Sequence, residues 1–223
     1  MKTRIVELKS APSTQTYAKE HYFSFLEGLT IIQALKQTGG HGRFGRPWVS
    51  KGENLTLTYA FSLLLDQKDL TALGLLLSFS AYTLLKGRGL SPRIKWPNDL
   101  LVNGKKIAGV LVETEFHSDF VTIFAGIGLN VNATKNDLSS IDQPATSLLI
   151  ETARSSDLNQ IQSQLTQNFS KHLTLFKEMG FAPFKEEYKQ NLAYTENDGC
   201  LFLKDEKGPI HSILSGEIEK KIP

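Results

Sequence analysis

Residues 40–48 carry the combination of side chains with the clearest chemical potential. They read Gly-His-Gly-Arg-Phe-Gly-Arg-Pro-Trp and lie between two apolar segments. The glycines let the backbone approach a ligand closely, while Arg43 and Arg46 offer planar forks that fit carboxylate and phosphate oxygens. Trp48 adds a flat face for a heterocycle. The loop predicts anionic nucleotide chemistry, although by itself it is as typical of a solvated loop or an RNA-binding segment.

Two further segments place polar groups at the expected ends of strands. Residues 95–100 read Lys-Trp-Pro-Asn-Asp-Leu and residues 105–111 read Lys-Lys-Ile-Ala-Gly-Val-Leu. Amide, carboxylate and ammonium groups then meet at one end of a strand pair. The alternative is a plain turn at Asn98 and Asp99 with lysines on its solvated side. Residues 126–132 add glycines, which leave space at a strand end, and asparagines, whose side-chain amides can hydrogen-bond to the polar edge of a ligand.

The elements around these segments predict an α+β fold with strands in hairpins and helices between them. Strands are expected at residues 3–9, 29–35, 55–62, 93–96, 100–102, 107–115 and 120–125, and helices after Ser13 and over residues 70–85 and 157–179. In residues 55–62 large apolar side chains alternate with smaller ones, which predicts a strand with one apolar face. Asn103-Gly104 predicts a hairpin turn. The loop at residues 40–48 is thus expected between two strands of one sheet.

Composition predicts a soluble globular protein with one main domain. The chain has 223 residues, 40% of them hydrophobic, and a net charge of +2, which falls short of a dedicated nucleic-acid binder. Its single cysteine, Cys200, excludes an intramolecular disulfide and a cysteine zinc site, and favours a cytoplasmic location. The N-terminus lacks a signal-peptide core, and polar residues interrupt the apolar stretch 70–85, so no membrane span is expected. From about residue 198 the pattern changes to a small β appendage.

Together, and in this order, the segments resemble the biotin protein ligases. The family pattern is a Ser-Thr pair, a Gly-Arg loop ending in Trp, Lys-Trp-Pro-Asn-Asp, Lys-x-Ala-Gly and Gly-x-Asn. This chain shows Ser13-Thr14, the loop 40–48, residues 95–99, 106–109 and 128–130, and a further match at 145–148. The resemblance covers about residues 9–150. So many ordered motifs rarely coincide by chance.

The resemblance implies a fold and a division into domains. The expected fold is the class II synthetase-like fold of the biotin/lipoate ligases, a mixed, largely antiparallel sheet with flanking helices. The catalytic domain is expected at residues 1–180. A C-terminal β domain is expected at 181–223; only residues 199–217 resemble the SH3-like barrel of the family, so this domain is expected to be incomplete.

The resemblance also implies a two-step reaction that forms a carbon–nitrogen bond. The carboxylate of biotin attacks the α-phosphate of ATP to give biotinyl-5'-AMP and pyrophosphate, and a lysine of a biotin carboxyl carrier protein, an acetyl-CoA carboxylase subunit, then displaces AMP. Mg²⁺ is expected to accompany ATP, although no acidic cluster in the sequence marks a dedicated metal cage.

Matching the family motifs assigns roles to individual residues. The catalytic residues implied are Arg43, Lys106 and Asp99. The biotin site implied is Ser13, Thr14, Gln15, Gln37, Gly40, His41, Gly42, Arg43, Lys106 and Gly109. The ATP and adenylate site implied is Arg43, Arg46, Trp48, Asn98, Lys106 and Asn130.

The chemistry agrees with these assignments. Two anions must meet in the first step, so the cations Arg43 and Lys106 are expected to neutralise carboxylate and phosphate together. Asp99 orients or deprotonates the incoming lysine, or is instead a carboxylate bonded to turn amides. Ser13 is both a candidate ligand for biotin and an ordinary helix cap.

Several alternatives remain open at this level. His41 stands where many family members carry Arg, which predicts at most weaker retention of the adenylate. The chain begins at the first strand of the catalytic domain, so a helix-turn-helix and DNA binding are not expected. A homodimer through an edge strand is compatible with the resemblance. A lipoate or octanoate ligase or transferase is the alternative substrate class, and a nucleic-acid-binding module is the alternative function.

Overall fold

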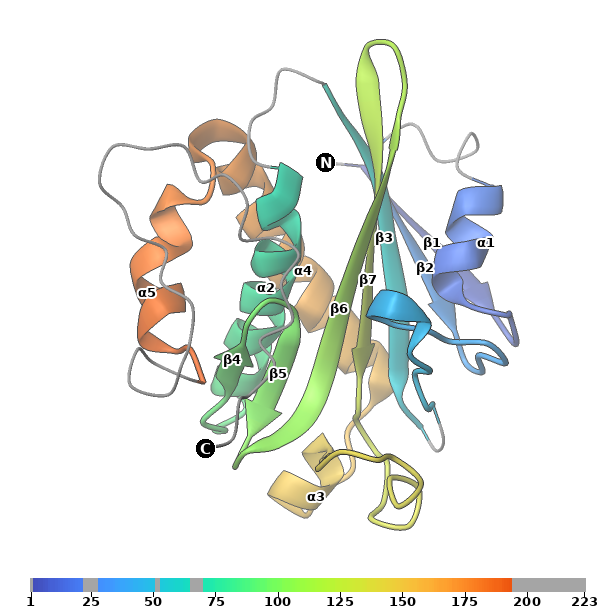
Figure 1. The fold of residues 1–223 in the computed structure, drawn as a ribbon, viewed down its shortest axis with the longest axis vertical. Helices are drawn as coiled ribbons and strands as arrows, with labels where there is room; N and C mark the ends of the chain where they lie inside the picture. The colour runs from blue at the N-terminus through green and yellow to red at the C-terminus, as the bar shows by residue number, and fades with distance from the viewer. Residues whose placement is uncertain (1, 22–27, 51–52, 65–69, 194–223) are drawn as a thin grey trace, which may run out of the picture. The chain divides into compact units, whose positions relative to one another are not determined.

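A seven-stranded sheet carries the described part of the chain (Figure 1). The computed structural model describes residues 2–21, 28–50, 53–64 and 70–193. The strands are β1 (Thr3–Leu8), β2 (Leu29–Ala34), β3 (Leu55–Leu64), β4 (Arg93–Lys95), β5 (Asp99–Val102), β6 (Lys105–Phe116) and β7 (Phe120–Leu129). Their order is β1-β2-β3-β7-β6-β5-β4. β1 and β2 are parallel and all other neighbours are antiparallel, which confirms the expected mixed, largely antiparallel sheet.

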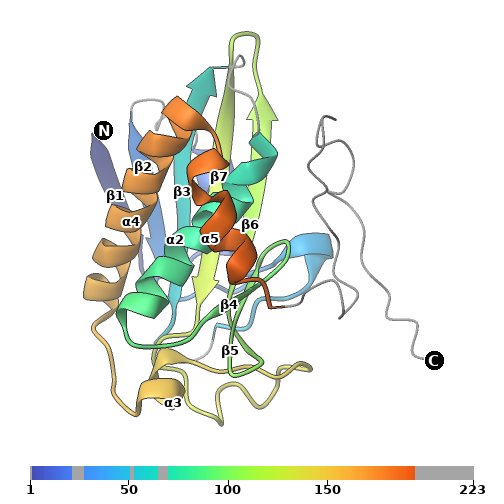
Figure 2. The same ribbon diagram turned by 90° about the vertical axis from the view of Figure 1, so that its left-hand side faces the viewer.

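Helices cover both faces of this sheet (Figures 1 and 2). The helices are α1 (Thr14–Glu20), α2 (Leu73–Gly87), α3 (Leu148–Thr152), α4 (Leu158–Met179) and α5 (Lys185–Gln190). Ile31 of β2 lies in the large core with α2 and α4, whereas its neighbour Ile32 packs with Ala18 of α1. Successive residues of a strand point to opposite faces, so α1 lies on one face and the pair α2 and α4 on the other.

Local signals explain where the elements begin and turn. Ser13 caps α1, because its Oγ accepts a hydrogen bond from the backbone N–H of Thr16 at 2.9 Å. Asn103 and Gly104 have φ of 50° and 73°, as a tight hairpin between β5 and β6 requires. Both features confirm the sequence prediction.

The predicted apolar face of β3 is confirmed, because Leu55, Leu57, Tyr59 and Phe61 lie in the large core. The alternate residues Thr56 and Thr58 are equally buried, with 2% and 0% of their surface exposed. The reason is that α1 packs against β3, so the polar face of the strand is also covered.

The apolar stretch around residues 70–85 is a core helix. A short 3₁₀ turn, Leu70–Ala72, leads into α2. The segment Leu70–Gly87 is long and apolar enough to cross a membrane by composition alone, yet 61% of it is buried within this protein. It packs against α4 and against strands β4 to β7, which matches the expectation of a core helix.

The compact unit that contains the sheet runs to Ala193. Phe184 and Tyr188 lie beyond residue 180, where the domain boundary was expected, and they are buried in the same core. The expected β appendage at residues 199–217 and Cys200 lie outside the described residues.

One half-buried histidine beside the core gives a testable pH dependence. His172 of α4 packs between Phe79 and Phe184, with ring centroids 5.4 and 5.2 Å away, and its Nδ1 lies 2.8 Å from Ser80 Oγ. Burial, aided by the charge of Lys171 and opposed by that of Glu187, lowers the pKa of His172 below its ordinary value of 6.5. The unfolded chain therefore binds the proton more readily, and the stability that this difference contributes is present above pH 6.5 and declines as pH falls through that value.

We expect His172→Phe to lose less stability between pH 8 and pH 5 than the parent protein does. Urea midpoints at both pH values measure this. The exposed His21, whose Nδ1 contacts the Tyr17 carbonyl, supplies the control variant His21→Gln, which should keep the parent pH dependence. Equal pH dependence in the His172→Phe variant and the parent would rule out His172 as a source of the pH dependence of stability.

Candidate active site

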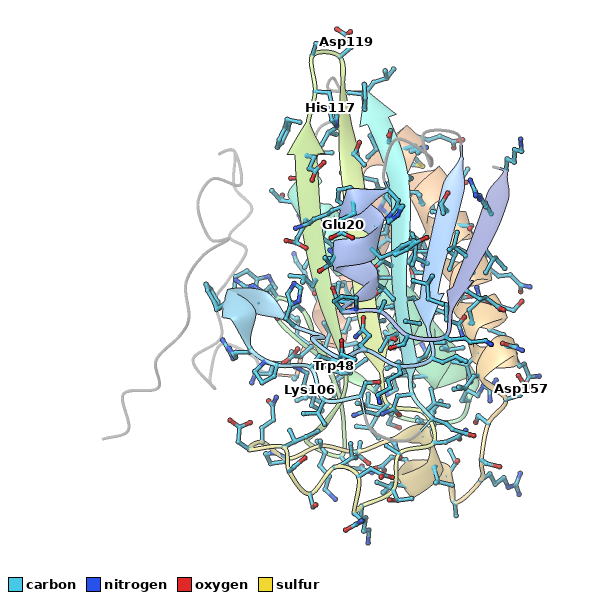
Figure 3. All side chains as sticks on the ribbon, turned by 90° about the vertical axis from the view of Figure 1, so that its right-hand side faces the viewer. Glu20, Trp48, Lys106, His117, Asp119 and Asp157 are labelled. Carbon is cyan, nitrogen blue, oxygen red and sulfur yellow. The ribbon has the colours of Figure 1, made fainter. Side chains whose placement is uncertain are left out.

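A cavity of about 150 Å³ opens where the N-terminal end of α1, the loop 40–48 and the ends of β3, β5, β6 and β7 meet. Figure 3 shows Trp48 and Lys106 together beneath α1, far from the tip of the β6–β7 hairpin that carries His117 and Asp119. The predicted site residues that line the cavity are Ser13, Thr14, Gln15, Gln37, His41, Gly42, Arg43, Arg46, Trp48, Asn98, Asp99, Lys106, Gly109 and Asn130. The structure thus brings together residues that are spread over more than a hundred positions.

Gly40 is the predicted site residue that does not line the cavity wall. A Cβ at this position would lie 2.6 Å from Gln37 Nε2 and 3.2 Å from the Trp48 carbonyl oxygen. Its carbonyl also accepts the backbone N–H of Trp48 at 2.9 Å. Gly40 therefore supports the site in two ways. It leaves room for the Gln37 side chain, and it holds the backbone of Trp48 in place.

Thr14 and Gln37 form one polar part of the cavity lining. Gln37 Oε1 accepts the backbone N–H of Thr14 at 2.7 Å and the Thr14 hydroxyl at 3.2 Å. A backbone N–H can only donate, so the carbonyl of the Gln37 amide must face Thr14 and its NH₂ group must face away. The Ser13 hydroxyl beside them serves the helix cap.

Gln15 fastens α1 to the sheet. Its Nε2 donates to the Phe124 carbonyl of β7 at 2.8 Å, and its Oε1 accepts the Thr58 hydroxyl of β3 at 2.9 Å. A Cβ on Gly126 would come within 2.8 Å of that Oε1, so a glycine is needed there. Both ends of the Gln15 amide are engaged by protein groups, and its observed contacts are those of an anchor for the helix.

An ion pair lies on the β5–β6 side of the cavity. Lys106 Nζ is 2.8 Å from Asp99 Oδ1, and the two side chains are only 18% and 15% exposed. Gly109 makes space for the pair, because a Cβ there would contact Lys106 Cε at 3.2 Å and Asp99 Oδ1 at 3.3 Å. An ammonium held this way has further N–H donors to offer to an anion.

Two asparagines hold the strand ends that frame the cavity. Asn98 exchanges hydrogen bonds with the backbone of Val110, through its Nδ2 at 3.0 Å and its carbonyl at 2.8 Å. Asn130 Nδ2 donates to the Thr146 carbonyl at 2.9 Å. The Oδ1 of Asn130 is buried and has no hydrogen-bond partner among the described residues. A buried acceptor of this kind in a cavity is available to a ligand.

Trp48 lies against the backbone of β7. A Cβ on Gly128 would come within 2.2 Å of the indole ring, so the ring rests directly on that glycine. Lys106 Nζ lies 5.7 Å from the ring centroid. The indole Nε1 is buried, and within the described part of the chain it has no hydrogen-bond partner. Trp48 thus adds a donor and an aromatic surface to the cavity.

The two arginines of the loop flank an exposed aromatic ring. The guanidinium carbons of Arg43 and Arg46 lie 5.1 and 5.7 Å from the ring centroid of Phe44, which is 67% exposed. Phe44 has φ of 57° inside the 3₁₀ turn Arg43–Gly45. The turn is closed by a 2.8 Å hydrogen bond from the Gly42 N–H to the Arg46 carbonyl. Both cations are thereby held at the rim of the cavity.

Some cavity residues were not assigned from the sequence. Thr56 and Thr58 belong to the polar face of β3, whose burial the alternation pattern does not reveal. Ile141 and Gln143 come from the segment between β7 and α3 and also line the cavity. That segment is held by Lys106, whose N–H donates to the Pro144 carbonyl at 2.9 Å, a long-range contact with no local signal.

Within the described ranges, no three His, Cys, Asp or Glu side chains gather where a metal ion could bind. Asp99, the carboxylate of the cavity, is paired with Lys106. The donor set therefore fits an anionic ligand better than a resident cation.

Comparisons with known proteins agree with this geometry. Residues 7–130 match the model of the biotin/lipoate A/B protein ligase family. The chain is 29% identical to the bifunctional ligase/repressor BirA of Bacillus subtilis, over 93% of this chain and 71% of that protein. It is 31% identical to the biotin–[acetyl-CoA-carboxylase] ligase of Paracoccus denitrificans, over 73% of this chain and 70% of that protein.

A solved structure shows the same fold. The biotin protein ligase of Aquifex aeolicus, in complex with biotin and ATP, superposes with a TM-score of 0.69 at 31% identity, covering 86% of this chain and 79% of that one. The family match spans more than half of the chain, and it includes the N-terminal end of α1, the loop 40–48 and the Lys106–Asp99 pair. The chain therefore belongs to the biotin/lipoate A/B protein ligase family.

Proposed function

We propose that this chain is a biotin protein ligase, which activates biotin with ATP and transfers it to a lysine of an acceptor protein. The observation that carries the proposal is one cavity lined by two different sets of polar groups. Thr14 and Gln37 offer neutral hydrogen-bonding groups, whereas Lys106, Trp48 and Asn130 offer an ammonium and the buried, unpartnered polar atoms described above. Biotin and ATP together need such a site.

In the first step the biotin carboxylate attacks the α-phosphate of ATP, the new bond forms between carboxylate oxygen and phosphorus, and pyrophosphate leaves. The reactants are both anions, so their approach requires positive charge that is already in place. Lys106 supplies it from β6, held by Asp99 at 2.8 Å, and Arg43 supplies it from the loop. Mg²⁺ enters with the phosphates of ATP as part of the substrate.

In the second step an acceptor lysine attacks the carbonyl carbon of biotinyl-5'-AMP, an amide forms, and AMP leaves. The attacking amine must first lose a proton. Asp99 is the carboxylate at the cavity, 15% exposed, and we assign it the orientation of that amine and the acceptance of its proton. Asp99 thus serves both steps. In the first it holds the Lys106 ammonium in place, and in the second it positions the acceptor lysine.

The acceptor that we propose is a biotin carboxyl carrier protein of a carboxylase. This extends to the chain what the name of the Paracoccus relative says of that protein. We place the reaction in the cytoplasm, where ATP and the carrier protein occur together. β1 forms one edge of the described sheet and exposes 52% of Ile5, a surface on which a second copy can pair.

Pyrophosphate exchange tests the proposal directly. Purified protein is incubated with ATP, Mg²⁺ and labelled pyrophosphate, together with biotin, lipoate, octanoate or no acid. Exchange with biotin alone supports the proposed function, and transfer of biotin to a carrier domain then completes it. Exchange with lipoate or octanoate in place of biotin would assign the chain to the other branch of its family. No exchange with any acid would contradict both the biotin and the lipoate or octanoate assignment.

A further inference from the structure

A chain of hydrogen bonds at the cavity includes one lining residue, Thr58, that has no role in the chemistry described so far. It begins at Thr58, whose side chain is fully buried in β3. The Thr58 hydroxyl lies 2.9 Å from Thr14 Oγ1 and 2.9 Å from Gln15 Oε1. Thr14 in turn contacts Gln37 Oε1. Four side chains from α1, β3 and the segment after β2 thus form one connected network.

The donors and acceptors of this network can be assigned by starting from the two glutamine side chains at its ends. Gln15 Oε1 and Gln37 Oε1 are carbonyl oxygens and only accept, whereas Thr58 and Thr14 each have one hydroxyl proton. If Thr58 donates to Thr14, then Thr14 donates to Gln37. If Thr58 donates to Gln15, its oxygen is free to accept the proton of Thr14. In both arrangements the Thr14 proton has an acceptor inside the protein, either Gln37 Oε1 or the Thr58 oxygen.

The consequence is a fixed pattern at the cavity. Thr14 can present only a lone pair of its oxygen to a ligand, and Gln37 can present only the N–H groups of its amide, whose Nε2 lies beside Gly40. An acceptor next to a donor complements a cyclic urea, in which each N–H stands next to the C=O. An acid that lacks such a head would leave both groups unpaired, which is costly at a buried site.

We propose that Thr58 is a positioning residue that directs the Thr14 proton away from the cavity, and so selects acids with a cyclic-urea head. This inference rests on the proposed function and deepens it. Thr58 touches neither reacting group. It acts through Thr14, and through Gln15, which keeps the start of α1 against the sheet.

The test compares Thr58→Val, which keeps the shape of the side chain, with Thr58→Ser, which keeps its hydroxyl. In biotin-dependent pyrophosphate exchange, Thr58→Val is expected to raise KM for biotin about tenfold, as expected when a buried acceptor loses its donor. Its KM for ATP and its kcat should stay within about twofold. Thr58→Ser should restore the parent KM for biotin. Desthiobiotin also contains the cyclic urea, so its inhibition constant as a competitor of biotin should rise in Thr58→Val by a similar factor.

Thr122→Val is the matched control, because Thr122 is a buried threonine of the same sheet, its hydroxyl lies 3.2 Å from His117 Nε2, and it does not line the cavity. An unchanged KM for biotin in folded Thr58→Val overturns the proposal. So does an equal rise in both KM values, or a rise in Thr122→Val of the same size. Failure of the parent protein to exchange with biotin would instead overturn the proposed function.

A second variant keeps the proposal testable if Thr58→Val does not fold. Gln37→Glu retains an oxygen for Thr14 but removes the N–H donors. We expect this variant to fold, by circular dichroism, and to lose at least tenfold in its affinity for biotin and for desthiobiotin. Parent-like affinity for both ligands would show that biotin does not depend on the N–H groups of Gln37, and the proposal would fail.

Discussion

Replacing Lys106 by glutamine is expected to lower biotin-dependent pyrophosphate exchange on the order of 10²- to 10³-fold, the usual effect of removing one group that stabilises developing negative charge. The substitution removes the partly buried ammonium from the cavity. It also leaves the Asp99 carboxylate, 15% exposed, without the cation at 2.8 Å that balances it. The site then repels the anions that it must bring together.

The adjacent Lys105 provides the control for this experiment. It is exposed, lies at the start of β6 next to the hairpin turn, and does not line the cavity. Lys105→Gln changes net charge by the same amount and should keep exchange within about twofold of the parent, as is usual for a solvated charge. Equal loss in both variants would trace the effect to the overall charge of the protein. Full activity of folded Lys106→Gln would remove Lys106 from the mechanism.

Gly128→Ala is expected to act at the nucleotide end of the site. The new methyl group would lie 2.2 Å from the indole of Trp48, so ring or strand must move. β7 cannot readily yield there, because Gly128 is paired with Thr56 on one side and Gly109 on the other. The ring must therefore leave its place. We expect KM for ATP to rise about 10- to 100-fold, the range that loss of one base-stacking aromatic produces.

The biotin end should be largely spared in this variant, so KM for biotin should change much less than KM for ATP. Gly74→Ala of α2 is the control for adding a methyl group, since a Cβ there meets only Val112 Cγ2 at an ordinary 3.8 Å. Exchange kinetics at varied ATP and varied biotin separate the two effects. A parent-like KM for ATP in folded Gly128→Ala would mean that Trp48 does not bind the nucleotide from its present position.

The sequence predicted the elements that have strong local signals. The cap at Ser13, the turn at Asn103-Gly104 and the three- and four-residue spacing of apolar residues in α4 each depend on near neighbours, and the structure confirms all three. The short helices α3 and α5 were not predicted, because five or six residues cannot show a helical period.

The site was predicted unevenly for a similar reason. Residues in compact motifs, such as most of the loop 40–48 and the segment around Asp99, were identified from the sequence and line the cavity. Thr58 and Gln143 were not, because their place depends on contacts that no local pattern encodes. Thr58 reaches Thr14 across 44 positions, and the segment of Gln143 is held by the backbone of Lys106. Long-range hydrogen bonds become visible only once the sheet is assembled.

The burial of α2 also has a consequence for how this protein is made. Strands β4 to β7 and helix α4, which pack on α2, follow it in the chain, whereas β2 and β3, which share its core, precede it. During synthesis a segment apolar enough by composition to enter a bilayer therefore leaves the ribosome before much of its covering exists. Until α4 has been made, the nascent chain exposes this surface to chaperones, to membranes and to other nascent chains.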